Sequence, residues 1–155
     1  MESIQIHDKH FVPFISRERI DRYVEFLADQ IAGDLDEGEV PIFIGILNGS
    51  FMFAADFMKK FKGDCHITFV KMASYDGVNS TGKIKHLVGI NEDLKGKTVI
   101  ILEDIIDTGN TLAEIYDIFR DKEVKKLKIA TLFFKPDVFR KELPIDYIGK
   151  SIEDR

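Results

Sequence analysis

The chain reads VIILEDIIDTGNTL over residues 99–112, and this stretch decides the fold. Its first four residues form an uninterrupted apolar run, which is typical of a strand buried on both faces of a sheet. Apolar residues at helical spacing follow it: Leu112, Ile115, Tyr116 and Phe119. The stretch therefore predicts a strand, a polar loop over residues 103–111, and a helix.

The same unit recurs along the chain. The expected strands are Ile42–Leu47, His66–Val70, Ile84–Ile90, Lys97–Leu102 and Leu127–Phe134. One helix is expected after Ser16, through Ile31, and another from Phe51 to Phe61. The polar stretch Ser74–Lys83 is expected to be a mobile loop. We predict one α/β domain over residues 1–155, with a mostly parallel central sheet and helices on both faces, and ligands at the carboxyl ends of the strands.

Composition excludes several functional classes. The 155 residues are 45% hydrophobic and 32% charged, as in a soluble globular protein. The net charge of −5 provides no broad positive field for a nucleic acid or an anionic membrane. The apolar runs fall far short of the roughly 18 residues that a membrane span needs. The single cysteine, Cys65, and the absence of a signal sequence favour a cytoplasmic location.

The end of the polar loop has the composition of a phosphate site. Thr108, Gly109, Asn110 and Thr111 lie where a helix begins, so that unpaired backbone N–H groups, two hydroxyls and the positive end of the helix converge. A phosphate monoester suits such a site. The alternative is that Thr108 or Asn110 only caps the helix.

Two acids precede this site. Glu103 and Asp104 can accept hydrogen bonds from a sugar diol and hold Mg²⁺ through its waters. Carboxylates beside a phosphate also suit a transition state in which positive charge develops at an anomeric carbon. The combination suggests transfer of a phosphorylated sugar. The alternative is that Glu103 and Asp104 only form the solvated end of a strand and bind no ligand.

Residues 99–112 resemble the phosphoribosyl diphosphate (PRPP) signature of type I phosphoribosyltransferases. Residues 45–53, Ser74-Tyr75 with Ser80-Thr81-Gly82, and Lys135 after an apolar strand are similar to the hypoxanthine-guanine members. The resemblance implies the fold of that family with a small incomplete hood. It also implies purine salvage, in which the 5-phosphoribosyl group passes from PRPP to hypoxanthine or guanine and pyrophosphate is released. A homodimer or homotetramer is expected.

The resemblance implies roles for the residues around the signature. Glu103 and Asp104 would contact the ribose hydroxyls, with Mg²⁺ nearby. The 5′-phosphate would be enclosed by Asp107, Thr108, Gly109, Asn110 and Thr111. Asp107 would also take the N7 proton of the purine as a general base.

Further roles fall on other segments. Asn48, Gly49 and Ser50 would hold pyrophosphate, in this family often with a non-proline cis peptide. Many members carry lysine where this chain has Asn48, so we expect the N–H groups of Gly49 and Ser50 to matter more.

The closing loop and the purine site complete the implied roles. Ser74 and Tyr75 would lie on the loop that closes over the reacting centre. Lys135 would donate to the purine O6, and Ile105 would pack on the ring. Relatives continue past Asp154-Arg155 into a purine-stacking and metal-binding segment, so we expect this chain to lack those contacts.

Three competing interpretations remain. Residues 105–109 match the hydrophobic-hydrophobic-Asp-Thr-Gly run of aspartic proteases, but that motif requires an all-β context. A regulator could use the same fold to sense PRPP without catalysis. A phosphoribosyltransferase could instead use xanthine, adenine or a pyrimidine.

Overall fold

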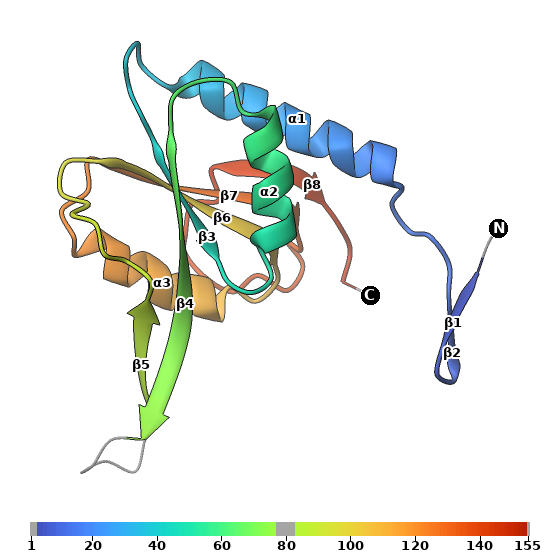
Figure 1. Ribbon diagram of the computed structural model, residues 1–155. Coiled ribbons are helices and arrows are strands. Elements are labelled where there is room, and N and C mark those ends of the chain that lie inside the picture. Colours follow the sequence, from blue (N-terminus) through green and yellow to red (C-terminus); the bar gives the residue numbers. More distant parts are fainter. Residues whose placement is uncertain (1–2, 77–82, 155) are drawn as a thin grey trace.

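The computed structural model describes residues 3–76 and 83–154, whose main feature is a six-stranded sheet (Figure 1). The strand order is β5-β4-β3-β6-β7-β8. Its members are β3 (Ile42–Ile46), β4 (His66–Asp76), β5 (Lys83–Val88), β6 (Thr98–Ile106), β7 (Lys126–Phe134) and β8 (Tyr147–Ser151). All neighbours pair in parallel except β4 and β5, which are antiparallel. The predicted α/β class with a mostly parallel sheet is confirmed.

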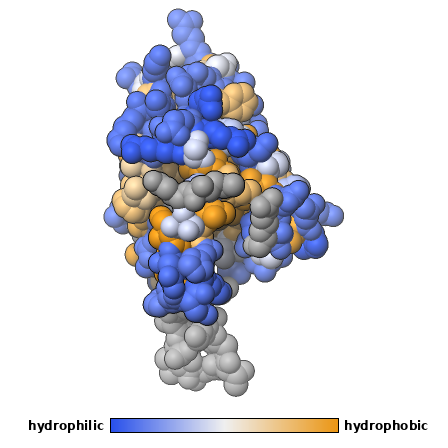
Figure 2. All heavy atoms as spheres, turned by 90° about the vertical axis from the view of Figure 1, so that its right-hand side faces the viewer, coloured by the Kyte–Doolittle hydropathy of each residue, from blue (hydrophilic) through white to orange (hydrophobic). Residues whose placement is uncertain are grey.

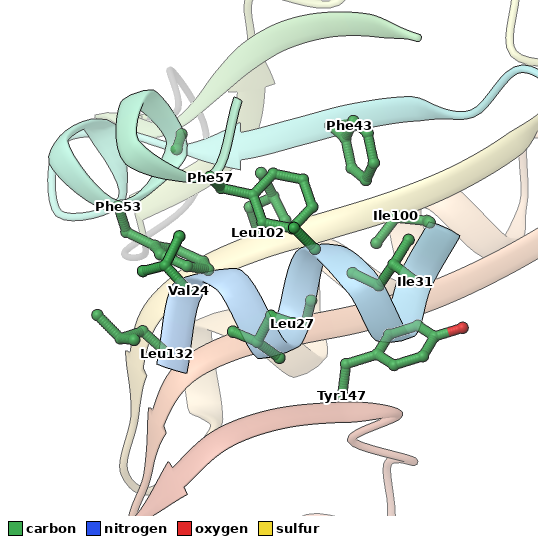
Figure 3. Close-up of a cluster of buried hydrophobic side chains, with 13 residues drawn as sticks. Val24, Leu27, Ile31, Phe43, Phe53, Phe57, Ile100, Leu102, Leu132 and Tyr147 are labelled. Atoms are coloured by element: carbon green, nitrogen blue, oxygen red, sulfur yellow. The ribbon is translucent and has the colours of Figure 1, made fainter. Parts of the chain in front are cut away.

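Helices cover both faces of this sheet. Helices α1 (Arg17–Asp34) and α2 (Phe51–Lys60) lie on one face, and α3 (Asn110–Arg120) lies on the other (Figure 1). Strand β3 supplies both cores because successive side chains alternate between faces. Phe43 packs with α1 and α2, as Figure 3 shows, whereas Ile42 and Ile44 pack with α3. A strand buried on both sides explains the uninterrupted apolar run.

Helix α1 begins where the sequence predicts. Ser16 is its N-cap, and the Ser16 side chain accepts a hydrogen bond from the Arg19 N–H. The buried stripe of the helix consists of Val24, Leu27, Ala28 and Ile31. Capping and apolar spacing therefore act together to place α1 against the sheet.

Strand β6 is longer than predicted. We expected a loop from residue 103 onward, but the ladder with β7 continues through Glu103, opposite Thr131, to Ile106, opposite Phe134. Glu103 and Asp104 are thus held in a strand. Their backbone groups can join the sheet because the polar side chains emerge near its carboxyl edge.

The expected loop over Ser74–Lys83 is also partly wrong. Ser74 and Tyr75 belong to β4, and they pair with Lys85 and Ile84 of β5. The Ser80-Thr81-Gly82 motif lies outside the described residues. Polar composition suggested a loop here, but backbone pairing between adjacent strands does not require apolar side chains.

Two elements were not predicted from the sequence. One is β8, and the other is a hairpin of β1 (Ile4–Ile6) and β2 (Lys9–Phe11) that projects from the body (Figure 1). On the face that carries the hairpin, hydrophobic residues gather between hydrophilic ones (Figure 2). Within residues 3–76 and 83–154, no helix has the length and apolar character that a membrane span requires.

Candidate active site

A short turn joins β6 to α3 at the carboxyl edge of the sheet. Gly109 adopts a φ of 82°, and a Cβ there would lie 2.5 Å from a ring carbon of Phe139. Only glycine satisfies both conditions. Gly109 also precedes the helix as its N-cap residue and offers no side-chain cap, so the alternative that Thr108 or Asn110 caps α3 is not supported. The first N–H groups of α3 are therefore directed at the turn rather than at a capping side chain.

A cavity of 290 Å³ opens over this turn. It brings together the predicted ribose and phosphate residues and the glycine from the segment after β3. Its lining includes Gly49, Glu103, Asp104, Ile105, Asp107, Thr108, Gly109, Asn110 and Thr111. A single hollow thus contains two acids, two hydroxyls and a helix N-terminus.

The two acids at this cavity interact electrostatically. Burial, as the larger cause, and the negative charge of Asp104 together raise the pKa of Glu103 to about 8. The site therefore favours a proton, a cation or a hydrogen-bond donor beside Glu103. A sugar hydroxyl or a metal-bound water supplies such a donor.

Asp107 is an exposed acid at the start of the turn. Its Oδ1 accepts a hydrogen bond from the Thr108 N–H at 2.6 Å. This contact orients the carboxylate, while its second oxygen can accept another proton. Asp107 is thus placed and oriented as an acceptor at the cavity.

The segment after β3 reaches the same cavity. The Leu47–Asn48 peptide is cis, as the resemblance implies, and Asn48 Oδ1 lies 3.5 Å from Lys71 Nζ. Gly49 lines the cavity. Ser50 departs from expectation, because its N–H donates to the Ile46 carbonyl and its side chain is buried. The Ser50 N–H is engaged within the fold instead of being free for a ligand.

A second cavity of 610 Å³ adjoins the first, with Ile105 lining both. Lys135 lines the second cavity, and its backbone N–H donates to the Ile106 carbonyl at 2.9 Å. The remaining lining residues come from two segments: His10, Phe11, Val12, Pro13, Phe14, Ile152 and Glu153. Its surface is mainly apolar, with the Lys135 ammonium as a polar group.

Sequence reasoning missed the N-terminal part of this second cavity. Residues 11–14 read FVPF, an apolar run without the periodicity of a helix. An apolar run next to polar residues can mark a binding surface, so this run was the signal that could have revealed the N-terminal part of the cavity. Ser74 and Tyr75 are placed only as backbone of β4, and their side chains lie outside the description.

Comparison with known proteins agrees with this geometry. Residues 16–155 match the model of the phosphoribosyl transferase domain. The chain belongs to the phosphoribosyltransferase family. The predicted family is thereby confirmed, and the helix directly after Gly109 excludes the all-β context of an aspartic protease.

Two bacterial proteins illustrate the similarity of this chain to its relatives. It is 40% identical over 120 residues to a hypoxanthine phosphoribosyltransferase of Escherichia coli, a match that covers 77% of this chain and 67% of the relative. It is 37% identical over 138 residues to a hypoxanthine-guanine phosphoribosyltransferase of Streptococcus pyogenes, with 88% and 76% covered.

A solved structure has the same fold. The crystal structure of a hypoxanthine-guanine phosphoribosyltransferase from Bacillus anthracis superposes with a TM-score of 0.79 and 38% identity. The superposition covers 91% of this chain and 81% of that one. The predicted fold of the type I family is thus confirmed.

Proposed function

We propose that this phosphoribosyltransferase transfers the 5-phosphoribosyl group from PRPP to hypoxanthine, and also to guanine, with release of pyrophosphate. One observation carries the proposal: Glu103 and Asp104 share a 290 Å³ cavity with the uncapped N-terminus of α3. An acidic pair beside an anion site suits a sugar phosphate whose anomeric carbon becomes cationic during the reaction. The bacterial relatives are named for hypoxanthine and guanine.

The 5′-phosphate is assigned to the turn. The N–H groups at the start of α3 and the hydroxyls of Thr108 and Thr111 supply the donors, and Gly109 allows the backbone to approach closely. Asp107 and Asn110 complete the lining of the phosphate site. The ribose hydroxyls are assigned to Glu103 and Asp104. Anchoring both ends of the sugar fixes C1′ for attack.

Asp107 is assigned the role of general base. As N9 of the purine bonds to C1′, the bond from C1′ to the pyrophosphate oxygen breaks and the proton on N7 passes to Asp107. The Thr108 N–H, 2.6 Å from Oδ1, holds the carboxylate while the other oxygen accepts the proton. The products are the nucleoside 5′-monophosphate and pyrophosphate.

The nucleobase is assigned to the larger cavity. Ile105 lies between the two cavities and provides an apolar surface for the ring, while Lys135 provides a donor for O6. Adenine carries an amino group at this position and has no lone pair to offer the ammonium. Lys135 therefore favours 6-oxopurines.

The acidic pair also fits Mg²⁺. Within the part of the chain that the structure describes, no three side chains of His, Cys, Asp or Glu converge as a metal cage. Mg²⁺ does not need one, because it retains several waters and takes ligands from substrate phosphates. Glu103 and Asp104 would hold it through water, and their mutual repulsion favours a cation. When bound, the ion neutralises the negative charge of the leaving pyrophosphate.

Pyrophosphate and assembly complete the proposal. Asn48 and Gly49 contact pyrophosphate at the segment after β3, with Ser50 assigned beside them. Ser74 and Tyr75 belong to the segment that closes over the reactants.

The enzyme acts in the cytoplasm as a homodimer or homotetramer. Phe51 and Met52 support assembly, because both are large hydrophobic residues exposed on α2.

Product formation tests the function. The chain is mixed with PRPP, Mg²⁺ and one base at a time: hypoxanthine, guanine, xanthine, adenine or uracil. We expect pyrophosphate and nucleoside monophosphate with hypoxanthine and guanine. Turnover with only adenine or uracil would assign another base specificity, and PRPP binding without turnover would identify a sensor.

A further inference from the structure

An ion pair joins two segments at the larger cavity. Lys135 Nζ donates to Asp154 Oδ1 at 2.8 Å. Lys135 directly follows β7, and Asp154 lies shortly after β8. We propose that Asp154 is a positioning residue that holds the Lys135 ammonium toward the nucleobase. This inference rests on the proposed function and adds a determinant of its base specificity.

Backbone contacts fix both ends of the pair. The Lys135 N–H donates to the Ile106 carbonyl at 2.9 Å, and the Ile152 N–H donates to the Phe134 carbonyl at 2.8 Å. Strands β7 and β8 also pair in parallel up to Phe134 and Ser151. The segments that directly follow β7 and β8 therefore lie side by side, and the ion pair links them.

The lysine of this pair is more buried than the lysines of two surface pairs. The Lys135 side chain is 18% exposed and its partner Asp154 is 52% exposed, whereas Lys59 and Lys95 in other pairs are 75% and 69% exposed. Exposed pairs contribute little because water screens them and long side chains lose freedom in forming them. Because water reaches the Lys135 side chain less than those two lysines, the Asp154 carboxylate has more influence on where the ammonium lies.

The geometry leaves the ammonium able to bind a second acceptor. An ammonium has three N–H donors, and Asp154 takes one of them. A lysine side chain is flexible, and a fixed carboxylate restricts its orientations. Asp154 thus acts on the base through Lys135, which lines the cavity together with Ile105 and Ile152.

The test compares Asp154→Asn with Asp117→Asn. Asp117 forms an exposed ion pair with Arg120 on α3, at 3.1 Å, so its substitution makes the same chemical change away from the cavity. For Asp154→Asn we expect KM for hypoxanthine to rise about tenfold, the loss of a directed polar contact, while kcat and KM for PRPP stay within about twofold. Asp154→Glu should restore most of the affinity, and Asp117→Asn should match the unaltered chain.

The outcomes separate this inference from the proposed function. If Asp154→Asn matches Asp117→Asn, or raises both KM values alike, the positioning role is overturned while the function stands. If the unaltered chain forms no product, the same variants are compared by equilibrium binding of hypoxanthine. A selective loss of hypoxanthine binding then supports the positioning role, and equal binding or no binding by any chain overturns it.

Discussion

The backbone of Gly49 lies against the carboxylate of Asp104. A Cβ at Gly49 would be 2.9 Å from Asp104 Oδ1. The segment after β3 and the acid on β6 therefore approach as closely as a glycine allows. This relationship joins the segment that we propose binds pyrophosphate to the acids that we propose bind the ribose.

Gly49→Ala should weaken PRPP binding without unfolding the chain. The added methyl group displaces the Asp104 carboxylate, and we expect the affinity for PRPP to fall about tenfold, as measured by calorimetry. The control is Gly33→Ala in α1, because a Cβ there would meet nothing within 4 Å. Equal PRPP affinities of the two variants would contradict this account of Gly49.

Glu103 should make the metal-free protein less stable as the pH rises. Its pKa is about 8 in the native state, through burial and Asp104, against a reference value of 4.5. The folded chain then binds more protons than the unfolded chain between these values, so the free energy of unfolding decreases from about pH 4.5 to about pH 8. Below this window both states are protonated.

Glu103→Gln should remove that decrease. Urea unfolding in EDTA gives the change in the free energy of unfolding between pH 5 and pH 8.5. This change should be smaller for Glu103→Gln than for the parent by at least about 1 kcal/mol, since one pKa unit is worth about 1.4 kcal/mol. Glu25→Gln, on the exposed side of α1, controls for the loss of a carboxylate. Parallel pH profiles for Glu103→Gln and the parent would refute the prediction.

Asp107→Asn should retain PRPP and lose turnover. The amide keeps the shape of the side chain but cannot accept the N7 proton as a carboxylate does, so kcat should fall about 10²- to 10⁴-fold. Calorimetry should find PRPP binding changed by less than about threefold. An unaltered kcat would remove Asp107 from the general-base role.

Lys135→Ala should abolish the preference for 6-oxopurines. Without the ammonium, O6 of hypoxanthine has no charged donor, and the ratio of kcat/KM for hypoxanthine to that for adenine should fall by at least about tenfold. Competition between the two bases measures this ratio directly. A preserved ratio would place base selection elsewhere.

Much of this fold could be predicted from local pattern. The apolar run that became β3 and the capped amphipathic stretch that became α1 carry their own periodicity. The polar end of β6 was mistaken for a loop because Glu103 and Asp104 resemble loop residues when their strand partners are unknown. Backbone pairing across the sheet decides such positions.

The candidate site also has one part that local sequence predicts and another part that depends on three-dimensional contacts. The stretch from Asp107 to Thr111, which holds the turn and the first residues of α3, was predicted as one site because its residues are contiguous in sequence. The ion pair of Lys135 with Asp154 and the hydrogen bond from Ser50 to Ile46 depend on three-dimensional contacts that spacing does not reveal. The contribution of residues 10–14 to the larger cavity likewise depends on where the chain folds back.

Binding of ribose 5-phosphate tests the central claim that the turn before α3 grips a sugar phosphate. Calorimetric titration of the chain with ribose 5-phosphate, and with ribose as the matched ligand lacking phosphate, measures this contact without requiring turnover. We predict one molecule of ribose 5-phosphate bound per chain, displaced by PRPP, and no measurable binding of ribose. Equal binding of the two sugars, or binding of neither, would contradict the account.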